Sequence, residues 1–218
     1  MTIRRDLAEL EAHGALSRTH GGARQAFTRG SPLPFSSRLD SDLETKRVLA
    51  EVAASLVADH ESVIVDNGTT CLEVARCLAG RPLTVLALSL HAAAALASRP
   101  GVYVTVPGGP VETDSLAMTA AGVENVRDIR ADVAVIGACS ASSLHGLTST
   151  TFEDAALKRA VLRASSRTIL VAGAEKLRRS STFRFGGPED LTHLVTTKDA
   201  PDDVLAMFRD VGVDVHLC

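Results

Sequence analysis

Short apolar runs that alternate with helical stretches are the feature that most restricts the fold of this chain. Each run is rich in valine, isoleucine or leucine and is too short for a helix. Apolar residues dominate these runs instead of alternating strictly with polar ones, which is typical of strands buried on both faces. The runs lie at 62–66, 83–89, 102–107, 133–138, 168–173, 193–197 and 213–217, and helical patterns lie at 46–57, 69–79, 91–98, 153–165 and 201–211. The alternation predicts an α/β fold: a Rossmann-like, mostly parallel sheet with helices on both faces.

Composition restricts the class of protein. Apolar residues make up 45% of the 218 residues and charged residues 22%, as in a globular chain with a sizeable core. No apolar run is long enough for a membrane span and no secretory signal is visible, so we expect a cytoplasmic protein without membrane contact. The four cysteines lack zinc-binding spacing, so we expect free thiols and no metal, and no cofactor motif is evident. They are Cys71, Cys77, Cys139 and Cys218.

A basic patch lies at the N-terminus, although the whole chain has a net charge of −3 and should not attract nucleic acid over its entire surface. Ile3, Leu7 and Leu10 predict a helix over 2–12, and weak alternation ending in two glycines predicts a β-hairpin over 15–24. The basic residues of this region are Arg4, Arg5, Arg18 and Arg24, with His13 and His20. Residues 25–44, rich in proline, serine and glycine, are expected to be a linker to one α/β domain over 45–218.

The segment DNGTT, from Asp66 to Thr70, is the first candidate for a ligand site. Ligands of parallel sheets bind beyond the carboxyl ends of the strands, and this segment joins such an end to a helix. Backbone amides and the helix dipole favour an anion at that place. An ordinary turn at Asn67 and Gly68, followed by a capping box of Thr70 and Glu73, explains the same residues equally well.

Other strand ends offer further candidates. Gly108 and Gly109 in VPGGP allow a ligand to approach the backbone, with a plain tight turn as the alternative. The segment IGACSASSLHGLT reads as a small polar loop, and Lys176 follows a strand where it can neutralise a phosphate. Glu153 and Lys158 lie on the next helix, where a helix cap and a solvent-exposed lysine are the alternative roles. The complete candidate set for a phosphorylated effector is Asp66, Asn67, Gly68, Thr69, Thr70, Ser89, Gly108, Gly109, Gly137, Gly146, Thr148, Glu153, Lys158 and Lys176.

Motifs of common enzymes are absent from the sequence. There is no GxSxG, HExxH or Walker loop, and the polar loop before residue 150 carries no carboxylate that would serve as a general base. We therefore expect a binding protein rather than an enzyme.

The segment TIRRDLAELEAHGALSRTHGGA resembles the end of the winged helix-turn-helix domain of DeoR-type bacterial transcriptional regulators. PFSSR, VDNGTT, VPGGP, HGLT, EDAALKRAV and EK resemble segments of their effector domain, so the resemblance covers essentially the full chain. It implies a fold similar to ribose-5-phosphate isomerase, a phosphorylated sugar or related metabolite as effector, a repressor, and a homo-oligomer that reads paired half-sites of double-stranded operator DNA. The helix over 2–12 would be the recognition helix, with Thr2, Arg4 and Arg5 at the major groove, and Arg18, His20 and Arg24 of the wing would contact phosphates.

The resemblance leaves two alternatives: an isomerase-like enzyme acting on sugar phosphates, and a metabolite-binding module without DNA binding. Regulators of this type carry further helices that brace the recognition helix. We therefore expect 1–24 to be a partial winged helix-turn-helix that, as it stands here, binds operator DNA weakly or not at all. Similar proteins have acidic residues where Cys139, Gly173 and Thr197 stand, which implies a less hydroxylated effector or the loss of sensing.

Overall fold

The main body of the protein is a seven-stranded sheet whose neighbouring strands are all parallel. The computed structural model describes residues 16–19, 22–25, 33–118, 122–142, 144–177 and 179–218. The strand order is β12-β11-β9-β6-β3-β4-β5. The bounds are β3 Ser62–Val65, β4 Thr84–Ala87, β5 Tyr103–Thr105, β6 Ala131–Gly137, β9 Ser165–Val171, β11 His193–Thr196 and β12 Asp214–Leu217.

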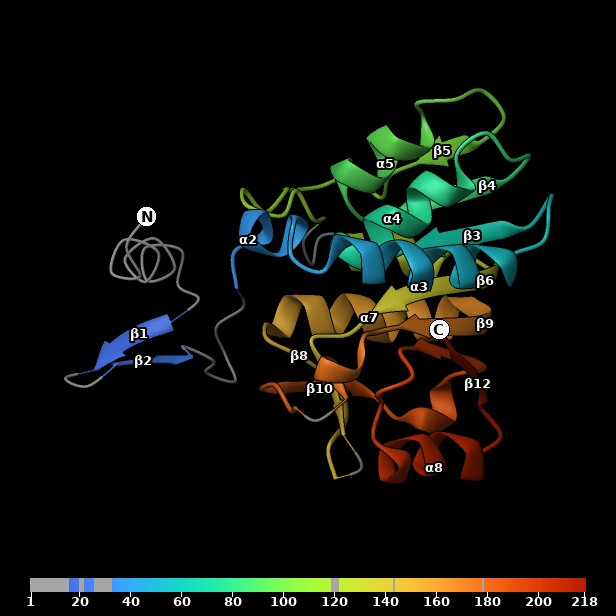
Figure 1. Cartoon of the computed structure of the whole chain (residues 1–218). Helices are drawn as coiled ribbons and strands as arrows, with labels where there is room; N and C mark the ends of the chain where they lie inside the picture. Colours follow the sequence, from blue (N-terminus) through green and yellow to red (C-terminus); the bar gives the residue numbers. More distant parts are fainter. Residues whose placement is uncertain (1–15, 20–21, 26–32, 119–121, 143, 178) are drawn as a thin grey trace.

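Helices cover both faces of the sheet because its strands send alternate side chains into two hydrophobic cores. In β3, Val63 and Val65 join the core under α3, α4 and α5, whereas Ile64 joins the core under α6, α7 and α8. Figure 1 shows α5 near β5 at one edge of the sheet and α8 near β12 at the other. The helices are α3 Leu43–Ser55, α4 Thr69–Leu78, α5 Leu90–Leu96, α6 Gly122–Arg127, α7 Phe152–Ala164 and α8 Asp202–Asp210.

The predicted fold class is confirmed, since each of the seven apolar runs forms a strand of this sheet. The prediction of an irregular polar loop before residue 150 is wrong. The segment forms an antiparallel pair, β7 Ser140–Ser142 and β8 Gly146–Ser149, and β10 Phe183–Gly186 adds a third strand. Ser140 and Thr148 are buried and their hydroxyl groups lie 2.9 Å apart, so these polar side chains bond to each other instead of to solvent.

The predicted linker over 25–44 is partly helical. Helix α2 spans Phe35–Leu39, and α3 already begins at Leu43. Phe35 is only 3% exposed, and burial of its aromatic ring helps to hold this short helix against the sheet domain. The segment therefore contains regular structure that the sequence did not predict.

The predicted hairpin is confirmed as β1 Leu16–Thr19 and β2 Gly22–Gln25. Their antiparallel register pairs Arg18 with Ala23 and Arg24 with Ser17. The predicted recognition helix over 2–12, with Thr2, Arg4 and Arg5, lies outside the described residues, as does His20.

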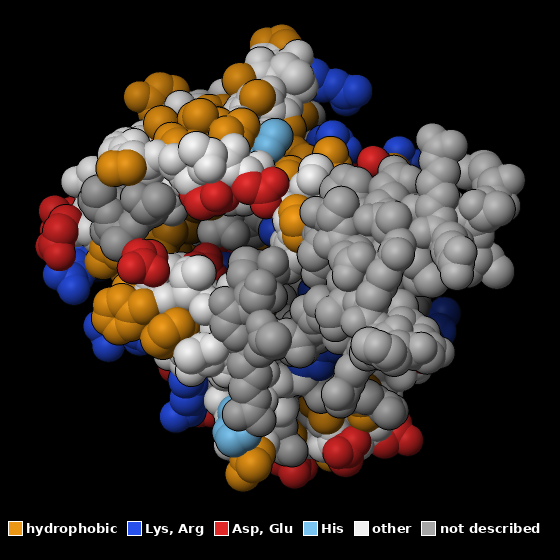
Figure 2. Space-filling model, turned by 90° about the vertical axis from the view of Figure 1, so that its left-hand side faces the viewer, with side chains coloured by type: hydrophobic (Ala, Val, Ile, Leu, Met, Phe, Trp, Pro, Cys, Tyr) orange, Lys and Arg blue, Asp and Glu red, His pale blue; other side chains and the backbone are white. Residues whose placement is uncertain are grey.

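The direction of winding reverses between β3 and β6. From β3 the chain proceeds outward to β4 and β5, and from β6 it proceeds the other way to β9, β11 and β12. Such a switch point opens a crevice at the carboxyl ends of the strands. In Figure 1 the arrowheads of β3 and β6 point toward the side on which α2, β8 and β10 lie. Figure 2 views that side, and in its coloured part acidic, basic and apolar side chains are interspersed.

Candidate functional site

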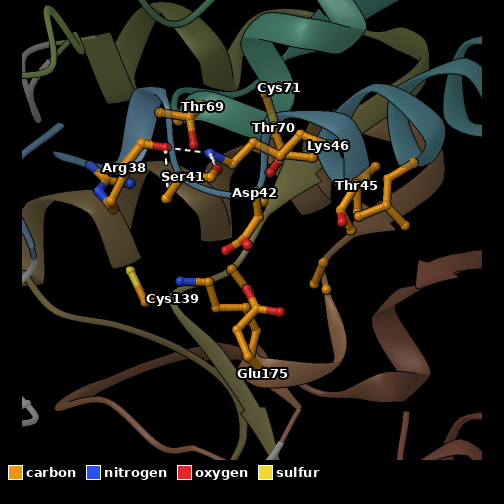
Figure 3. Close-up of a pocket in the computed structure, with 18 of the residues that line it drawn as sticks. Arg38, Ser41, Asp42, Thr45, Lys46, Thr69, Thr70, Cys71, Cys139 and Glu175 are labelled. Atoms are coloured by element: carbon orange, nitrogen blue, oxygen red, sulfur yellow. Dashed lines mark hydrogen bonds between the residues drawn. The ribbon is translucent and has the colours of Figure 1, made fainter. Parts of the chain in front are cut away.

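A pocket of about 420 Å³ lies beyond the carboxyl ends of β3, β6 and β9. Its walls come from six places in the chain: the α2–α3 segment, the start of α4, the residues after β6, the face of α7, the turn after β9 and the turn after β11. This volume accommodates a small metabolite rather than a macromolecule. Figure 3 shows Thr69 and Thr70 on one side of the pocket, with Cys139 and Glu175 across from them.

The start of α4 is open toward this pocket. Gly68 occupies the N-cap position with φ 105°, and it has no side chain that could accept a hydrogen bond from the first turn. Among the described residues, none accepts a hydrogen bond from the amide groups of Thr69, Thr70 and Cys71. The predicted capping box is wrong, because Glu73 pairs with Arg76 instead of returning to the helix start. Three amide donors and the helix dipole are therefore available to an anion.

Besides Lys158 and Arg179, three cations face the same space from different elements. Arg38 comes from α2, Lys46 from α3 and Lys176 from the 3-10 turn Ala174–Lys176 after β9. Burial is the largest cause that lowers the pKa of Lys46 and of Lys176, and the charge of Arg38 lowers both pKa values further. Lys46 also donates to the carbonyl oxygens of Arg38 and Ser41, as the dashed lines in Figure 3 mark. The three cations therefore influence one another across the pocket that they line.

A buried ion pair lies at the floor of the pocket. Lys158 of α7 is 3% exposed and donates to Oδ2 of Asp66, which is fully buried and also accepts from the Gly137 amide at 2.9 Å. Asp154 lies one helical turn before Lys158, with Oδ1 3.6 Å from the ammonium group. Burial alone lowers the pKa of Lys158, but the charges of Asp154 and Asp66 outweigh it and raise that pKa above its usual value. Lys158 is therefore a fixed cation whose charge is already matched by carboxylates.

The other oxygen of this carboxyl group, Asp66 Oδ1, is buried and has no hydrogen-bond partner among the described residues. Burial accordingly raises the pKa of Asp66, with Lys158 acting in the opposite direction. The neighbouring Cys71 thiol is also buried, and burial together with the charge of Asp66 raises its pKa. The floor of the pocket is thus a compact, desolvated layer rather than a surface that offers a free charge.

Carboxylates complete the lining. Asp42, Asp154, Glu175 and Asp199 all border the pocket. Gly173 stands where similar proteins were expected to have an acid, and the Glu175 carboxylate occupies the space into which a side chain at residue 173 would project. An acidic group is therefore present at this strand end, although it comes from a different position in the chain. Cations for a phosphate and carboxylate acceptors for hydroxyl groups are present together.

Half of the predicted effector-binding residues line the pocket, and others lie elsewhere. The lining includes Asn67, Gly68, Thr69, Thr70, Gly137, Lys158 and Lys176, and Asp66 lies beneath it. Ser89 caps α5 by accepting from the Ala92 amide at 3.2 Å. Gly108 and Gly109 are exposed in the turn after β5, two strands away from β3.

Three further predicted residues have structural surroundings of their own. Thr148 is buried and accepts from the Ser181 amide at 2.8 Å, and Gly146 is the first residue of β8, directly after the hairpin turn, with φ 66°. Glu153 is exposed in the first turn of α7. The cap of that helix is Thr151, whose hydroxyl accepts from the Asp154 amide at 3.2 Å. The alternative roles considered for Glu153 as a cap and for Lys158 as an exposed lysine are both wrong.

Sequence reasoning missed the contribution of the α2–α3 segment: Arg38, Ser41, Asp42, Thr45 and Lys46 all line the pocket. It also missed Asp154, which accepts from the Asn67 side-chain amide at 3.0 Å and so joins α7 to the α4 loop. A signal for Asp154 existed, because residues 154 and 158 are four apart and share a helix face, whereas residue 153 does not face residue 158.

Two classes of feature are not found in the described part of the chain. No group of three or more His, Cys, Asp or Glu side chains there has an arrangement that could hold a metal ion. No helix in that part is long and apolar enough to cross a membrane.

Comparison with known proteins gives matches over nearly the whole chain. The model of the DeoR C terminal sensor domain matches residues 41–198, and that of the DeoR-like helix-turn-helix domain matches residues 1–28. The transcriptional repressor AccR of Agrobacterium fabrum is 33% identical over 89% of this chain and 77% of its own length. The HTH-type transcriptional regulator GolR of Listeria innocua serovar 6a is 28% identical over 99% of this chain and 86% of its own.

Among solved structures, ribose 5-phosphate isomerase A from Methanocaldococcus jannaschii matches with a TM-score of 0.47 and 15% identity. That match covers 63% of this chain and about half of the isomerase, 55%. The full-length relatives just described are regulators and not enzymes, which agrees with the lack of catalytic motifs. The parallel sheet with a pocket at its switch point, and the two adjoining domain matches, lead to one conclusion: the chain belongs to the DeoR family of DNA-binding transcriptional regulators.

Proposed function

We propose that this regulator is a repressor whose pocket at the β3–β6 switch point binds a small phosphorylated sugar or polyol as its effector. The observation that carries the proposal is the uncapped start of α4, with free amides at Thr69 and Thr70, opposite the ammonium group of Lys176. A dianionic phosphate satisfies these donors and removes the repulsion between the surrounding cations. If the effector binds one arrangement of the regulator more tightly than another, effector binding changes the affinity of the regulator for operator DNA.

The hydroxyl groups of the effector are assigned to the carboxylates. Glu175 and Asp42 line the pocket from different elements, and both residues are exposed to solvent. Carboxylates accept hydrogen bonds from hydroxyl groups and repel a second phosphate, which favours a metabolite with one phosphate and several hydroxyls. This reasoning supports a sugar or polyol monophosphate over a bisphosphate.

The DNA-binding role is assigned to the N-terminal segment. The β1–β2 hairpin brings two arginine positions, Arg18 and Arg24, into one small element, and phosphate contacts by such a wing would orient the regulator on its site. We further infer a homo-oligomer, because paired half-sites are read by paired subunits. Sedimentation equilibrium of the full chain tests that inference, and a monomer at all concentrations would contradict it.

The experiment that tests the effector site is calorimetric titration of the full chain with glucose 6-phosphate, glucose and inorganic phosphate. Glucose 6-phosphate and inorganic phosphate should bind, and glucose should not. Lys176→Met should weaken both by about tenfold, as expected for the loss of one charge-assisted hydrogen bond. Lys198→Met is the matched control, since Lys198 is exposed and lies outside the pocket lining. Equal binding of glucose, or no effect of Lys176→Met, would contradict the assignment.

A further inference from the structure

Helix α2 lies in the chain between the two segments that match the DeoR family models. The helix-turn-helix match ends at residue 28 and the sensor match begins at residue 41, so α2, Phe35–Leu39, belongs to neither. Leu33 and Arg38 of this intervening segment nevertheless line the sensor pocket. The ligand site is therefore completed by residues from outside the sensor domain proper.

The segment is held from two sides. On one side, the Phe35 amide donates to Asp114 Oδ2 at 2.5 Å, and the Phe35 ring stacks on His91 with centroids 4.7 Å apart. On the other side, the ammonium group of Lys46 caps the end of α2 by donating to the carbonyl oxygens of Arg38 and Ser41. Because Lys46 also borders the pocket, any anion bound there shares a cation with the cap of α2.

Arg38 is the one side chain of α2 with unused donors toward this space. Its Nε donates to the Leu33 carbonyl at 3.0 Å, and its guanidinium lies 5.6 Å from the Phe35 ring centroid. Neither terminal nitrogen has an acceptor, and no carboxylate lies within ion-pair distance of the group, among the residues that the structure describes. The ammonium group of Lys176, on the far side of the pocket, likewise has no acceptor among them.

We propose that Arg38 is an effector-binding residue: the phosphate of the effector bridges Arg38 and Lys176, and thereby fixes α2 against the turn after β9. This rests on the proposed function of the pocket and adds the residue that connects it to the DNA-binding segment. A planar guanidinium suits two phosphate oxygens at once, which ties the orientation of α2 to the position of the ligand. Without an anion, the repulsion between Arg38 and Lys176 opposes a close approach of α2 to the turn after β9.

The first test is titration of the full chain with inorganic phosphate for wild type, Arg38→Met, Lys176→Met and Arg47→Met. Methionine retains a flexible apolar side chain of similar length but removes the charge. Arg38→Met and Lys176→Met should each weaken phosphate binding about tenfold, about 1.4 kcal/mol. Arg47→Met is the control, because Arg47 is exposed on α3 outside the lining and faces only Glu44 at 3.7 Å. Arg38→Gln, which keeps a donor for the Leu33 carbonyl, should show the same loss and serves if Arg38→Met folds poorly.

The second test is hydrogen exchange of the amides over 35–40 at saturating phosphate. Phosphate should slow exchange there in wild type and Arg47→Met, but not in Arg38→Met, although the start of α4 is slowed in all three. The inference is overturned if both Arg38 variants bind phosphate with unchanged affinity, or if phosphate slows amide exchange in α2 of Arg38→Met as much as in wild type. In either case, a loss of phosphate affinity in Lys176→Met would still support the proposed pocket. Failure of wild type to bind phosphate overturns both.

Discussion

The buried pair of Lys158 and Asp66 gives the sharpest prediction about stability. In Lys158→Met, the carboxylate of Asp66 keeps one donor, the Gly137 amide, for two buried oxygens, and Oδ1 already has no partner. Removing one member of a buried ion pair costs about 3–5 kcal/mol. Since a domain of this size is stable by about 5–15 kcal/mol, this is a large fraction of the total. The melting temperature should fall by about 6–20 °C.

A second substitution and a lower pH should each reduce this loss of stability. Asp66→Asn in the Lys158→Met background removes the unpaired charge, so the double variant should recover most of the loss. In Lys158→Met alone, burial holds the pKa of Asp66 above its unfolded value of about 3.9. A carboxyl with a raised folded pKa contributes its full stability below the unfolded pKa and loses it as pH rises through the folded value. The deficit of the variant should therefore shrink toward about pH 4.

Urea unfolding of wild type, both variants and Arg163→Met measures these differences. Arg163 is an exposed residue near the end of the same helix, and its substitution should change stability by no more than about 0.5 kcal/mol. The interpretation of Lys158 as an indispensable counter-ion is refuted if Lys158→Met loses less than about 1 kcal/mol, or if the double variant is no more stable than the single one.

Three further outcomes are expected. Gly68→Ala should destabilise the fold by about 1–3 kcal/mol in chemical denaturation, because φ 105° strains any other residue although no atom within 4 Å opposes the methyl group; a neutral result would place the strain elsewhere. In native protein, iodoacetamide should modify Cys139 in the pocket more slowly when phosphate is present. It should leave Cys71 unmodified, because burial raises the pKa of that thiol. Mass spectrometry of the two peptides checks both points, and rapid labelling of Cys71 would contradict the structure. Affinity for phosphate should fall as the pH is raised from neutrality toward about pH 10, because burial lowers the pKa of Lys176 and a neutral amine loses its attraction; pH-independent calorimetric affinity would exclude this role.

The strands were predictable from the sequence because buried parallel strands require apolar residues on both faces. Val63, Ile64 and Val65 enter two different cores, and such a run has few other stable environments. The β7–β8 hairpin escaped prediction for the opposite reason. Its stability depends on hydroxyl pairs such as Ser140 with Thr148, and these have no signature in a polar stretch until the partner strand is known.

The site was predictable only where one short segment carries it. The candidate anion site at the start of α4 is local, since Gly68 and the amides that follow are consecutive in the chain. Arg38 and Lys46 join it through tertiary packing, because α2 and α3 fold back beside a helix that is distant in sequence. Their contribution had one visible cue: Phe35 is an isolated aromatic residue in a polar stretch, and such a residue needs a hydrophobic contact.

The reversal of winding between β3 and β6 has a consequence for synthesis of the protein. These strands are neighbours in the sheet, yet the whole of α4, β4, α5 and β5 is made between them. The pocket takes its first lining residue at Leu33 and its last at Asp199. A growing chain on the ribosome can therefore shape the start of α4 early, but the pocket lacks part of its lining until Asp199 has emerged. Metabolite binding thus cannot precede the folding of the turn after β11 against the start of α4.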